Sequence, residues 1–305
     1  MVPDTTSLLA VPNVSEGRDR AVIDLIAASF TAGERTRLLD VHADPDHHRA
    51  VYTLAGSPGT LADALVTGAR AALSHVDVMT DQPPGGRGEH PHVGAIDVLP
   101  VVYLDATMRG AACAEALVVA DRIGTELEVP VFLYGELTAT EGKPARTRAE
   151  LRRGGCRGLA ERIASGEQHP DFGPPELHPT AGATLMAARE PLVAFNLELA
   201  PPATVTDARR IASLIREGGA EALRGLRAIG VPLETRGVAQ VSMNVERPLE
   251  LPLARIVEAV SRHAEIAAAE LVGLAPRAAL EGFPKDIPIL GFDPARQLIE
   301  TALSL

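Results

Sequence analysis

The sequence of 305 residues contains no tryptophan, and only 3% of its residues are aromatic. Its hydrophobic fraction of 46% is nevertheless ordinary for a soluble globular protein, so the core must be built mainly from Ala, Val, Leu and Ile. The scarcity of aromatic rings argues against a surface on which nucleic-acid bases stack. The length is sufficient for two compact units.

Lysine is almost absent, because 27 of the 29 basic residues are arginines, and the formal net charge is -11. No block of basic residues occurs, which argues against nucleic-acid binding, since phosphate contacts need a basic face. Arginine can bind a carboxylate through two parallel hydrogen bonds, so some of these residues could hold an acidic substrate. A general compositional bias is the alternative explanation for the excess of arginine.

Cysteine is equally rare, and the two residues, Cys113 and Cys156, form no paired motif. This usage is typical of a reducing compartment. The N-terminus lacks a basic region followed by an apolar stretch, and no apolar run approaches the roughly 18 residues of a membrane span. We therefore expect a cytoplasmic protein that does not enter the membrane.

Short apolar runs alternate with stretches of helical periodicity along most of the chain. The pattern predicts strands at residues 7–14, 37–43, 48–56, 95–104 and 129–135, and helices at 18–30, 57–73 and 106–127. Residues 137–181 are polar and rich in Gly and Pro, as in a linker or a functional loop.

The alternation returns after this interval, with adjacent strands predicted at 183–190 and 191–200 and two further helices beyond them. We interpret the chain as an α+β protein of two subdomains, residues 1–180 and 181–305. Each subdomain is expected to have helices on the outside and a mixed sheet, and the two sheets are expected to face one another.

Eight of the nine histidines lie in the first 180 residues, and two of them occur in the stretch GEHPHVGAIDV at residues 88–98. Glycines there allow the backbone to approach a ligand closely, and Glu89 precedes His90 directly. Imidazole titrates near neutral pH, so a positioned His90 could take up and return a proton within one catalytic cycle. A solvated loop histidine is the simpler alternative.

The same stretch also permits a metal site. In an extended segment His90 and His92 would project to one side, and Asp44, Asp97 or His47 could complete the ligand set. Pro91 and the absence of a longer metal-binding signature weigh against this alternative, so we expect no metal.

Two other loops are candidates for ligand contact. In VPNVSEGRD, residues 11–19, Ser15 could cap the following helix, and the exposed backbone N–H groups could equally receive a substrate carboxylate. The segment PDFGPPELHPTAG, residues 170–182, is restrained by its prolines. It could contact a flat ligand at low entropic cost or simply connect the two subdomains.

Taken together, these stretches resemble the formiminotransferase domain family. The similar segments include VPNVSEGRD, LLDVHADPDHHRAVYTLAG, GEHPHVGAIDVLPV, VPVFLYGE, PDFGP, LVAFNLEL, GVAQVSMN and LVGLAP, which follow the family's order over nearly the whole chain. The resemblance implies two ferredoxin-like α+β subdomains whose sheets stack face to face, a folate-binding tunnel between them, and a homodimer.

The resemblance also implies a reaction. The formimino group of N-formimino-L-glutamate would be transferred to N5 of tetrahydrofolate, giving 5-formiminotetrahydrofolate and L-glutamate, as in histidine degradation and one-carbon metabolism. A folate enzyme that uses a formyl donor and a non-catalytic folate-binding protein are the alternatives. Some members of the family are fused to a cyclodeaminase domain, which releases ammonia from the product. For this chain, the resemblance implies that a separate protein supplies that activity.

Residue by residue, the family's E-H-P motif assigns the general acid and base to His90. Arg49 matches a family arginine and is our candidate anchor for a substrate carboxylate, with Asn13, Glu89 and His92 as further substrate contacts. The family has Arg where this chain has His92, which makes a nearby positive charge dependent on pH. The implied folate-binding residues are Gly173, Pro174, Pro175, Glu176, Leu177, His178, Pro179, Thr180, Ala181 and Gly182.

Overall fold

The computed structural model describes residues 7–33, 35–80 and 91–304, and the chain divides into two compact units between Arg189 and Glu190. This division comes later than the boundary expected at residues 180 and 181, because the strand at 184–189 belongs to the first unit. Within the described ranges, no helix combines the length and the apolar composition that a membrane crossing requires.

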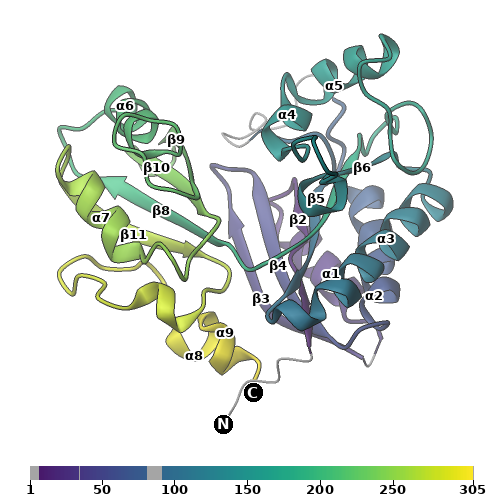
Figure 1. Ribbon diagram of the computed structural model, residues 1–305, viewed down its shortest axis with the longest axis horizontal. Coiled ribbons are helices and arrows are strands. Elements are labelled where there is room, and N and C mark those ends of the chain that lie inside the picture. Colours follow the sequence, from purple (N-terminus) through teal and green to yellow (C-terminus); the bar gives the residue numbers. More distant parts are fainter. Residues whose placement is uncertain (1–6, 34, 81–90, 305) are drawn as a thin grey trace. The chain divides into compact units, whose positions relative to one another are not determined.

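The first unit contains a β-α-β-β-α-β arrangement whose strands follow the ferredoxin-like order (Figure 1). Its elements are β1 (Leu8–Ala10), β2 (Asn13–Val14), α1 (Arg20–Phe30), β3 (Thr36–Asp44), β4 (Arg49–Gly56), α2 (Leu61–His75) and β5 (Ile96–Tyr103). β1 and β2 act as one strand interrupted around Pro12, since both pair antiparallel with β4 on one side and with β5 on the other. β3 pairs with the far side of β4.

Two further strands extend this sheet beyond β5. After the 3₁₀ turn η1 (Ala106–Met108), α3 (Arg109–Glu126) leads to β6 (Val131–Leu133), and β7 (Thr184–Arg189) lies between β5 and β6 and is parallel to both. The first sheet is therefore mixed, as predicted. Residues 183–190 contain a strand, as predicted, and this strand, β7, hydrogen-bonds to β5 and β6 rather than to the strand that follows it in the sequence.

The packing of α1 illustrates how the sequence builds this layer. Ile23, Ile26, Ala27 and Phe30 recur at helical spacing and are buried on one face of the helix. Gly68 on α2 provides the space for the Phe30 ring, because a side-chain carbon at that position would lie 2.1 Å from a ring atom.

The helix cap differs from the sequence expectation. Asp19 caps α1 by accepting hydrogen bonds from the backbone N–H groups of Ala21 and Val22. Ser15, the residue proposed as the cap, is buried and donates instead to the carbonyl of Gly94 at 2.8 Å. This bond attaches the end of β2 to the segment that follows residue 90.

The interval 137–181, interpreted from sequence as a linker or a loop, contains the helices α4 (Arg148–Arg152) and α5 (Gly155–Ala164) after the 3₁₀ turn η2 (Gly135–Thr138). α4 starts with a capping box, in which the Thr147 hydroxyl accepts from the Glu150 N–H and the Glu150 carboxylate accepts from the Thr147 N–H. The pattern Thr-Arg-Ala-Glu was thus a readable start signal within a polar stretch.

The second unit is a complete ferredoxin-like domain with strand order β11-β8-β10-β9. Its elements are β8 (Val193–Leu199), α6 (Val205–Ile215), β9 (Leu226–Leu233), β10 (Val238–Val245), α7 (Leu253–Ser261), β11 (Ile266–Val272), η3 (Arg277–Leu280), α8 (Pro294–Gln297) and α9 (Ile299–Ala302). All pairings among these strands are antiparallel, so the mixed sheet expected for this unit was wrong.

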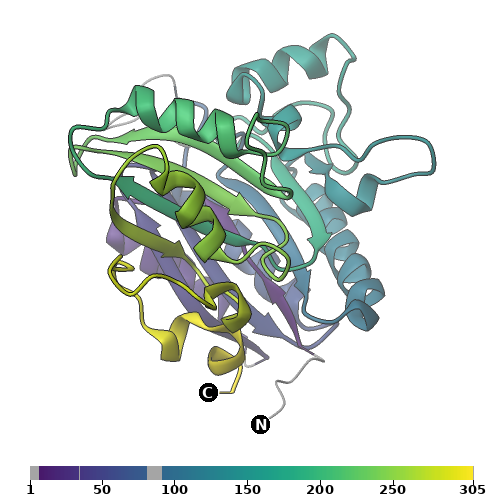
Figure 2. The same ribbon diagram turned by 60° about the vertical axis from the view of Figure 1, so that its left-hand side comes forward.

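Helices α6 and α7 cover one face of this four-stranded sheet (Figure 2). Alternate residues of β8, namely Val193, Phe195, Leu197 and Leu199, point into the core under these helices. The α+β architecture with two ferredoxin-like subdomains is therefore present. The face-to-face stacking of the two sheets stays a prediction.

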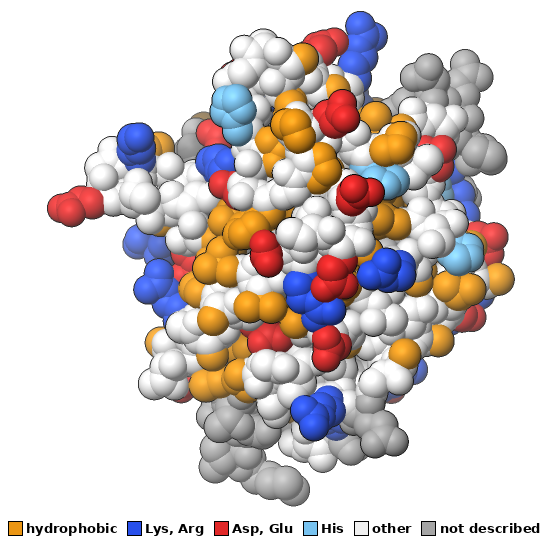
Figure 3. Space-filling model, turned by 90° about the vertical axis from the view of Figure 1, so that its right-hand side faces the viewer, with side chains coloured by type: hydrophobic (Ala, Val, Ile, Leu, Met, Phe, Trp, Pro, Cys, Tyr) orange, Lys and Arg blue, Asp and Glu red, His pale blue; other side chains and the backbone are white. Residues whose placement is uncertain are grey.

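Lysine and arginine side chains on the face of the molecule in Figure 3 are scattered among acidic and apolar side chains. The described residues on this face thus form no continuous basic surface of the kind that phosphate backbones require.

Candidate functional site

A buried cluster of charges lies in the first unit where β4, β5 and α4 meet. The carboxylate of Asp97 on β5 accepts from Nη2 of Arg49 at 2.7 Å and from the guanidinium of Arg152, whose Nε is 3.3 Å from Oδ1. It also accepts from the backbone N–H of Val93 at 2.9 Å. Asp97 has no exposed surface, and both arginines are more than nine-tenths buried.

The pKa values reflect this environment. Burial raises the pKa of Asp97. The charges of Arg152 and Arg49 and the hydrogen bonds to the carboxylate together lower it by a larger amount, so the pKa of Asp97 is below its ordinary value. Burial lowers the pKa of Arg49 to about 10, with Asp97 opposing this change. Asp97 and Arg49 are therefore charged at neutral pH, and the one carboxylate of Asp97 is shared by two arginines.

The cluster holds the segment that follows His90. Arg49 donates through Nη2 to the carbonyl of Pro91 at 3.2 Å and through Nη1 to Oδ1 of Asn13 at 3.3 Å. Asp97 holds the N–H of Val93, and Ser15 holds the carbonyl of Gly94. Residues 91–94 are thus attached to β2, β4 and β5 by side chains as well as by backbone.

A second group of polar residues lies at the turn between β3 and β4. Nδ1 of His48 accepts from the backbone N–H of Gly17 at 3.2 Å and lies 3.6 Å from a carboxylate oxygen of Glu16. Burial lowers the pKa of His48, Glu16 opposes this, and the charges of Arg18 and His92 lower it further.

Glycine is required at position 17, because an added side-chain carbon would lie 2.2 Å from the carbonyl oxygen of Asp44 and 2.4 Å from the amide nitrogen of Arg49. This close approach brings the end of β2 against the start of β4. Of the residues that sequence reasoning selected, Asn13 and Arg49 are joined by a hydrogen bond, and Arg49 also contacts the carbonyl of Pro91, the residue directly before His92.

The segment 173–182 lies beside residues 93–95. The N–H of Ala95 donates to the carbonyl of Ala181 at 2.9 Å, and Gly94 and Gly182 form an isolated bridge. Gly182 has φ of +67°, and a side-chain carbon there would lie 2.3 Å from the carbonyl oxygen of Val93. The two loops implicated by sequence therefore form one structural unit.

His178 shapes this segment from within. Its Nδ1 accepts from the backbone N–H of Ala181 at 3.0 Å and of Thr180 at 3.3 Å. A further backbone bond links the carbonyl of Thr180 to the N–H of Val78 at 2.9 Å. The tip of the segment is thus fixed, while Pro175 and Glu176 are exposed.

His90 and Glu89, the predicted catalytic residue and its neighbour, lie outside the described residues. Among the residues that the structure describes, no group of three or more His, Cys, Asp and Glu side chains could hold a metal ion. Asp97, a candidate ligand in the metal alternative, binds two arginines instead. Asp44 accepts from the backbone N–H of His47 at 2.8 Å.

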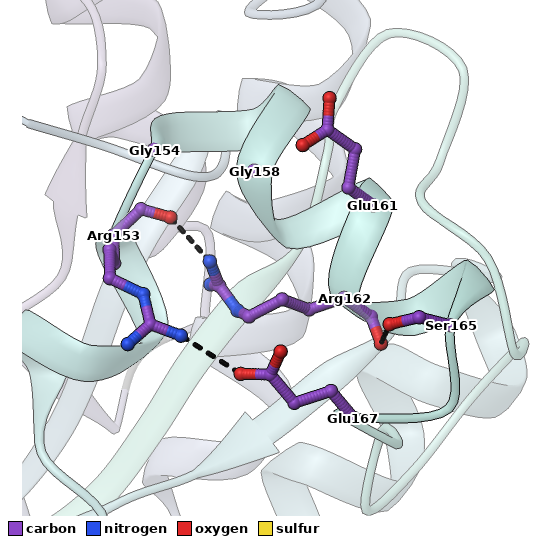
Figure 4. A pocket seen from close by; sticks show the side chains of 7 residues that line it. All are labelled: Arg153, Gly154, Gly158, Glu161, Arg162, Ser165 and Glu167. Carbon is purple, nitrogen blue, oxygen red and sulfur yellow. Dashed lines mark hydrogen bonds and ion pairs between the residues drawn. The ribbon is translucent and has the colours of Figure 1, made fainter.

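Sequence reasoning missed Arg152 as a partner of Asp97, and it missed the helix that carries it. The position of α4 is maintained by Arg162 of α5, which donates to the carbonyls of Leu151 and Arg153 at 2.7 Å and 2.5 Å. Figure 4 shows the hollow beside this contact, lined by Arg153, Gly154, Gly158, Glu161, Arg162, Ser165 and Glu167. These contacts connect the end of α4 to α5 and so restrain Arg152.

Comparison with known proteins matches both units to one family. The family described as "Formiminotransferase domain, N-terminal subdomain" matches residues 7–189, and "Formiminotransferase domain" matches residues 194–282. The chain belongs to the formiminotransferase family. The two matched ranges fall within the two units of the structure, so the family's subdomains correspond to the observed domains.

Individual relatives support this assignment over nearly the full length. Glutamate formimidoyltransferase of Streptococcus pyogenes serotype M1 is 36% identical over 302 residues, which cover 96% of this chain and 97% of the relative. That of Thermoplasma acidophilum is 32% identical, with 93% of both chains covered. Formimidoyltransferase-cyclodeaminase of Mus musculus is 36% identical over 284 residues, and the match covers 88% of this chain and 50% of the mouse protein. The chain thus spans about half the length of such bifunctional relatives.

Proposed function

We propose that this protein is a glutamate formimidoyltransferase, which transfers the formimino group of N-formimino-L-glutamate to N5 of tetrahydrofolate. The observation that carries the proposal is the connection between the loop after His90 and the segment 173–182 through Gly94, Ala95, Ala181 and Gly182. The two stretches implied in catalysis and in folate binding are therefore adjacent within one unit. Two relatives that are named glutamate formimidoyltransferase, and that match this chain over nearly their whole length, support the same conclusion.

The proposed chemistry needs a proton to move twice. N5 of tetrahydrofolate attacks the amidine carbon and loses a proton, and the bond from that carbon to the glutamate nitrogen then breaks as this nitrogen gains one. A single histidine can accept the first proton and return it in the second step. We assign this role to His90, because Pro91 and Val93, just after it, are held by Arg49 and Asp97.

The charge of the site suits an anionic donor. Arg49 and Arg152 together carry two positive charges, and Asp97 carries one negative charge, so the cluster keeps a net positive charge inside an acidic protein. Attraction over short distances in a poorly solvated environment is much stronger than in water. We propose that Asn13, Arg49, Glu89 and His92 form the surroundings of the donor, with Arg49 as a source of the positive charge at its carboxylate.

We assign folate contact to residues 173–182. Restrained by prolines and by the His178 side chain, this segment loses little conformational entropy when a flat ligand binds. Tetrahydrofolate acts as the co-substrate. We also propose that the enzyme acts in histidine degradation, in the cytoplasm and as a homodimer.

The test is turnover of tetrahydrofolate with N-formimino-L-glutamate, followed by the methenyl chromophore that the product gives on acidification. N-formyl-L-glutamate serves as the competing donor, because the difference at His92 alters the charge near the reacting group. Formimino transfer with a higher kcat/KM than formyl transfer is expected. Preference for the formyl donor, or folate binding without turnover of either donor, would contradict the proposal.

A further inference from the structure

The charge cluster around Asp97 has a third arginine beside it. Arg148 precedes Arg152 by four residues in α4, so the two side chains lie on the same face of that helix. The positive charge of Arg148 also acts on Arg49. Burial is the main cause of the lowered pKa of Arg49, and the charge of Arg148 is a smaller cause. Arg148 thus lies on the same face of α4 as Arg152, which pairs with the buried carboxylate of Asp97.

Arg148 differs from its neighbours in the chain in having no carboxylate partner. Arg146 pairs with Asp171, Arg152 with Asp97, Arg153 with Glu167, and Arg157 with Glu161. Within the described part of the chain, the Arg148 side chain forms neither an ion pair nor a hydrogen bond, and it is partly exposed. Its donors are thus available to a ligand from solvent.

The ring of Tyr134 fixes the position of this guanidinium. The central carbon of the Arg148 guanidinium lies 5.8 Å from the ring centroid, within the range of a cation–π interaction. Tyr134 follows β6 directly and is only 5% exposed, so the ring is a rigid support. Its hydroxyl is buried without a hydrogen-bond partner among the described residues, which is an unfavourable arrangement for a residue of purely structural role.

A guanidinium that lies over a ring and has free donors can match the two oxygens of a carboxylate. Both substrates of the proposed reaction carry carboxylates. The α-carboxylate of N-formimino-L-glutamate is attached to the carbon next to the reacting nitrogen, whereas the carboxylates of folate lie at the opposite end from N5. A site beside Arg49, which holds the residue after His90, is therefore close to the donor's reacting end.

We propose that Arg148, supported by Tyr134, binds the α-carboxylate of the glutamate donor and so determines the choice of donor. The inference rests on the proposed function and adds to it a substrate contact outside the motifs noted in the sequence. Arg49 and Arg152 then contribute charge, and Arg148 makes the direct contact.

The experiment compares wild type, Arg148→Gln and Arg148→Lys in steady-state formimino transfer. Arg157→Gln is the matched control, because Arg157 is an exposed arginine of the next helix and lies outside the site. Loss of a charge-assisted pair predicts a KM for N-formimino-L-glutamate raised about 10- to 100-fold in Arg148→Gln, with a smaller rise in Arg148→Lys. The KM for tetrahydrofolate should stay unchanged. Because the contact with Arg148 is expected to be equally strong in the ground state and the transition state, kcat should change by less than about threefold.

A second measurement separates this inference from the proposed function. Calorimetric titration with L-glutamate and with 4-aminobutyrate, which lacks the α-carboxylate, needs no turnover. The wild type should bind L-glutamate more tightly than 4-aminobutyrate, and Arg148→Gln should lose that preference while retaining its circular dichroism spectrum. An inactive wild type that still shows this preference would overturn the proposed reaction alone. An unchanged donor KM, or a raised KM for tetrahydrofolate alone, would overturn the role of Arg148.

Discussion

Replacement of Asp97 by asparagine tests the charge cluster most severely. Asn has nearly the same shape as Asp, so the variant removes the negative charge and leaves Arg49 and Arg152 buried next to each other without compensation. Breaking a buried ion pair in this way typically costs about 3–5 kcal/mol. This is a large share of the roughly 5–15 kcal/mol that stabilises a domain.

The loss is measurable by urea and thermal unfolding followed by circular dichroism. For a unit of this size the midpoint of thermal unfolding should fall by roughly 6–20 °C. Asp121→Asn, a substitution of an exposed carboxylate on α3, is the control and should change stability by less than about 0.5 kcal/mol.

The effect should also depend on pH, with a sign set by the lowered pKa of Asp97. A carboxyl group whose pKa is lower in the folded state stabilises the fold fully above its unfolded pKa of about 3.9. That contribution is lost as the pH falls through the lower folded pKa. The stability difference between wild type and Asp97→Asn should therefore be constant from pH 5 to 8 and shrink below about pH 4. A variant within about 1 kcal/mol of wild type at pH 7 would refute the reasoning.

Two further substitutions probe the loops beside the cluster. His92→Arg should retain kcat and make the donor KM less dependent on pH between 6 and 8, since guanidinium stays charged where imidazole titrates; loss of all activity in a folded variant would exclude a substrate-steering charge at this position. Gly182→Ala should lower the thermal midpoint and raise the KM for tetrahydrofolate, because its left-handed φ costs about 1–2 kcal/mol and the new carbon meets the Val93 carbonyl. Gly166→Ala has a similar φ of +76° but nothing within 4 Å, so it should leave that KM unchanged; equal effects of both glycine substitutions on the KM would argue against contact between loop and ligand.

Much of the fold could be predicted because its signals are local. The helix 57–73 and the strands at 48–56 and 95–104 carry clear periodicity or apolar runs, and the structure confirms them as α2, β4 and β5. The placement of β7 could not be predicted in this way, since a short apolar strand does not reveal its pairing partner. Its parallel neighbours β5 and β6 lie far away in the sequence.

The site was predicted in part for the same reason. Motifs identified the strand that carries Arg49 and the segment 173–182, and the structure brings both to residues 91–95. The pairing of Asp97 with Arg152 spans 55 residues and depends on how α4 packs, which no local pattern encodes. The start of α4 was readable from its Thr147 and Glu150 capping box, although the surrounding Gly and Pro residues favoured a loop.

The central claim is that His90 acts as the general acid and base of formimino transfer. The most direct measurement is a single-turnover reaction of wild type and His90→Ala with bound tetrahydrofolate and excess N-formimino-L-glutamate, with folate affinity determined in parallel. The account predicts rapid formation of 5-formiminotetrahydrofolate in the wild type, and in the variant unchanged folate affinity with a rate about 100- to 10,000-fold lower. A variant that binds folate and reacts at the wild-type rate would contradict it.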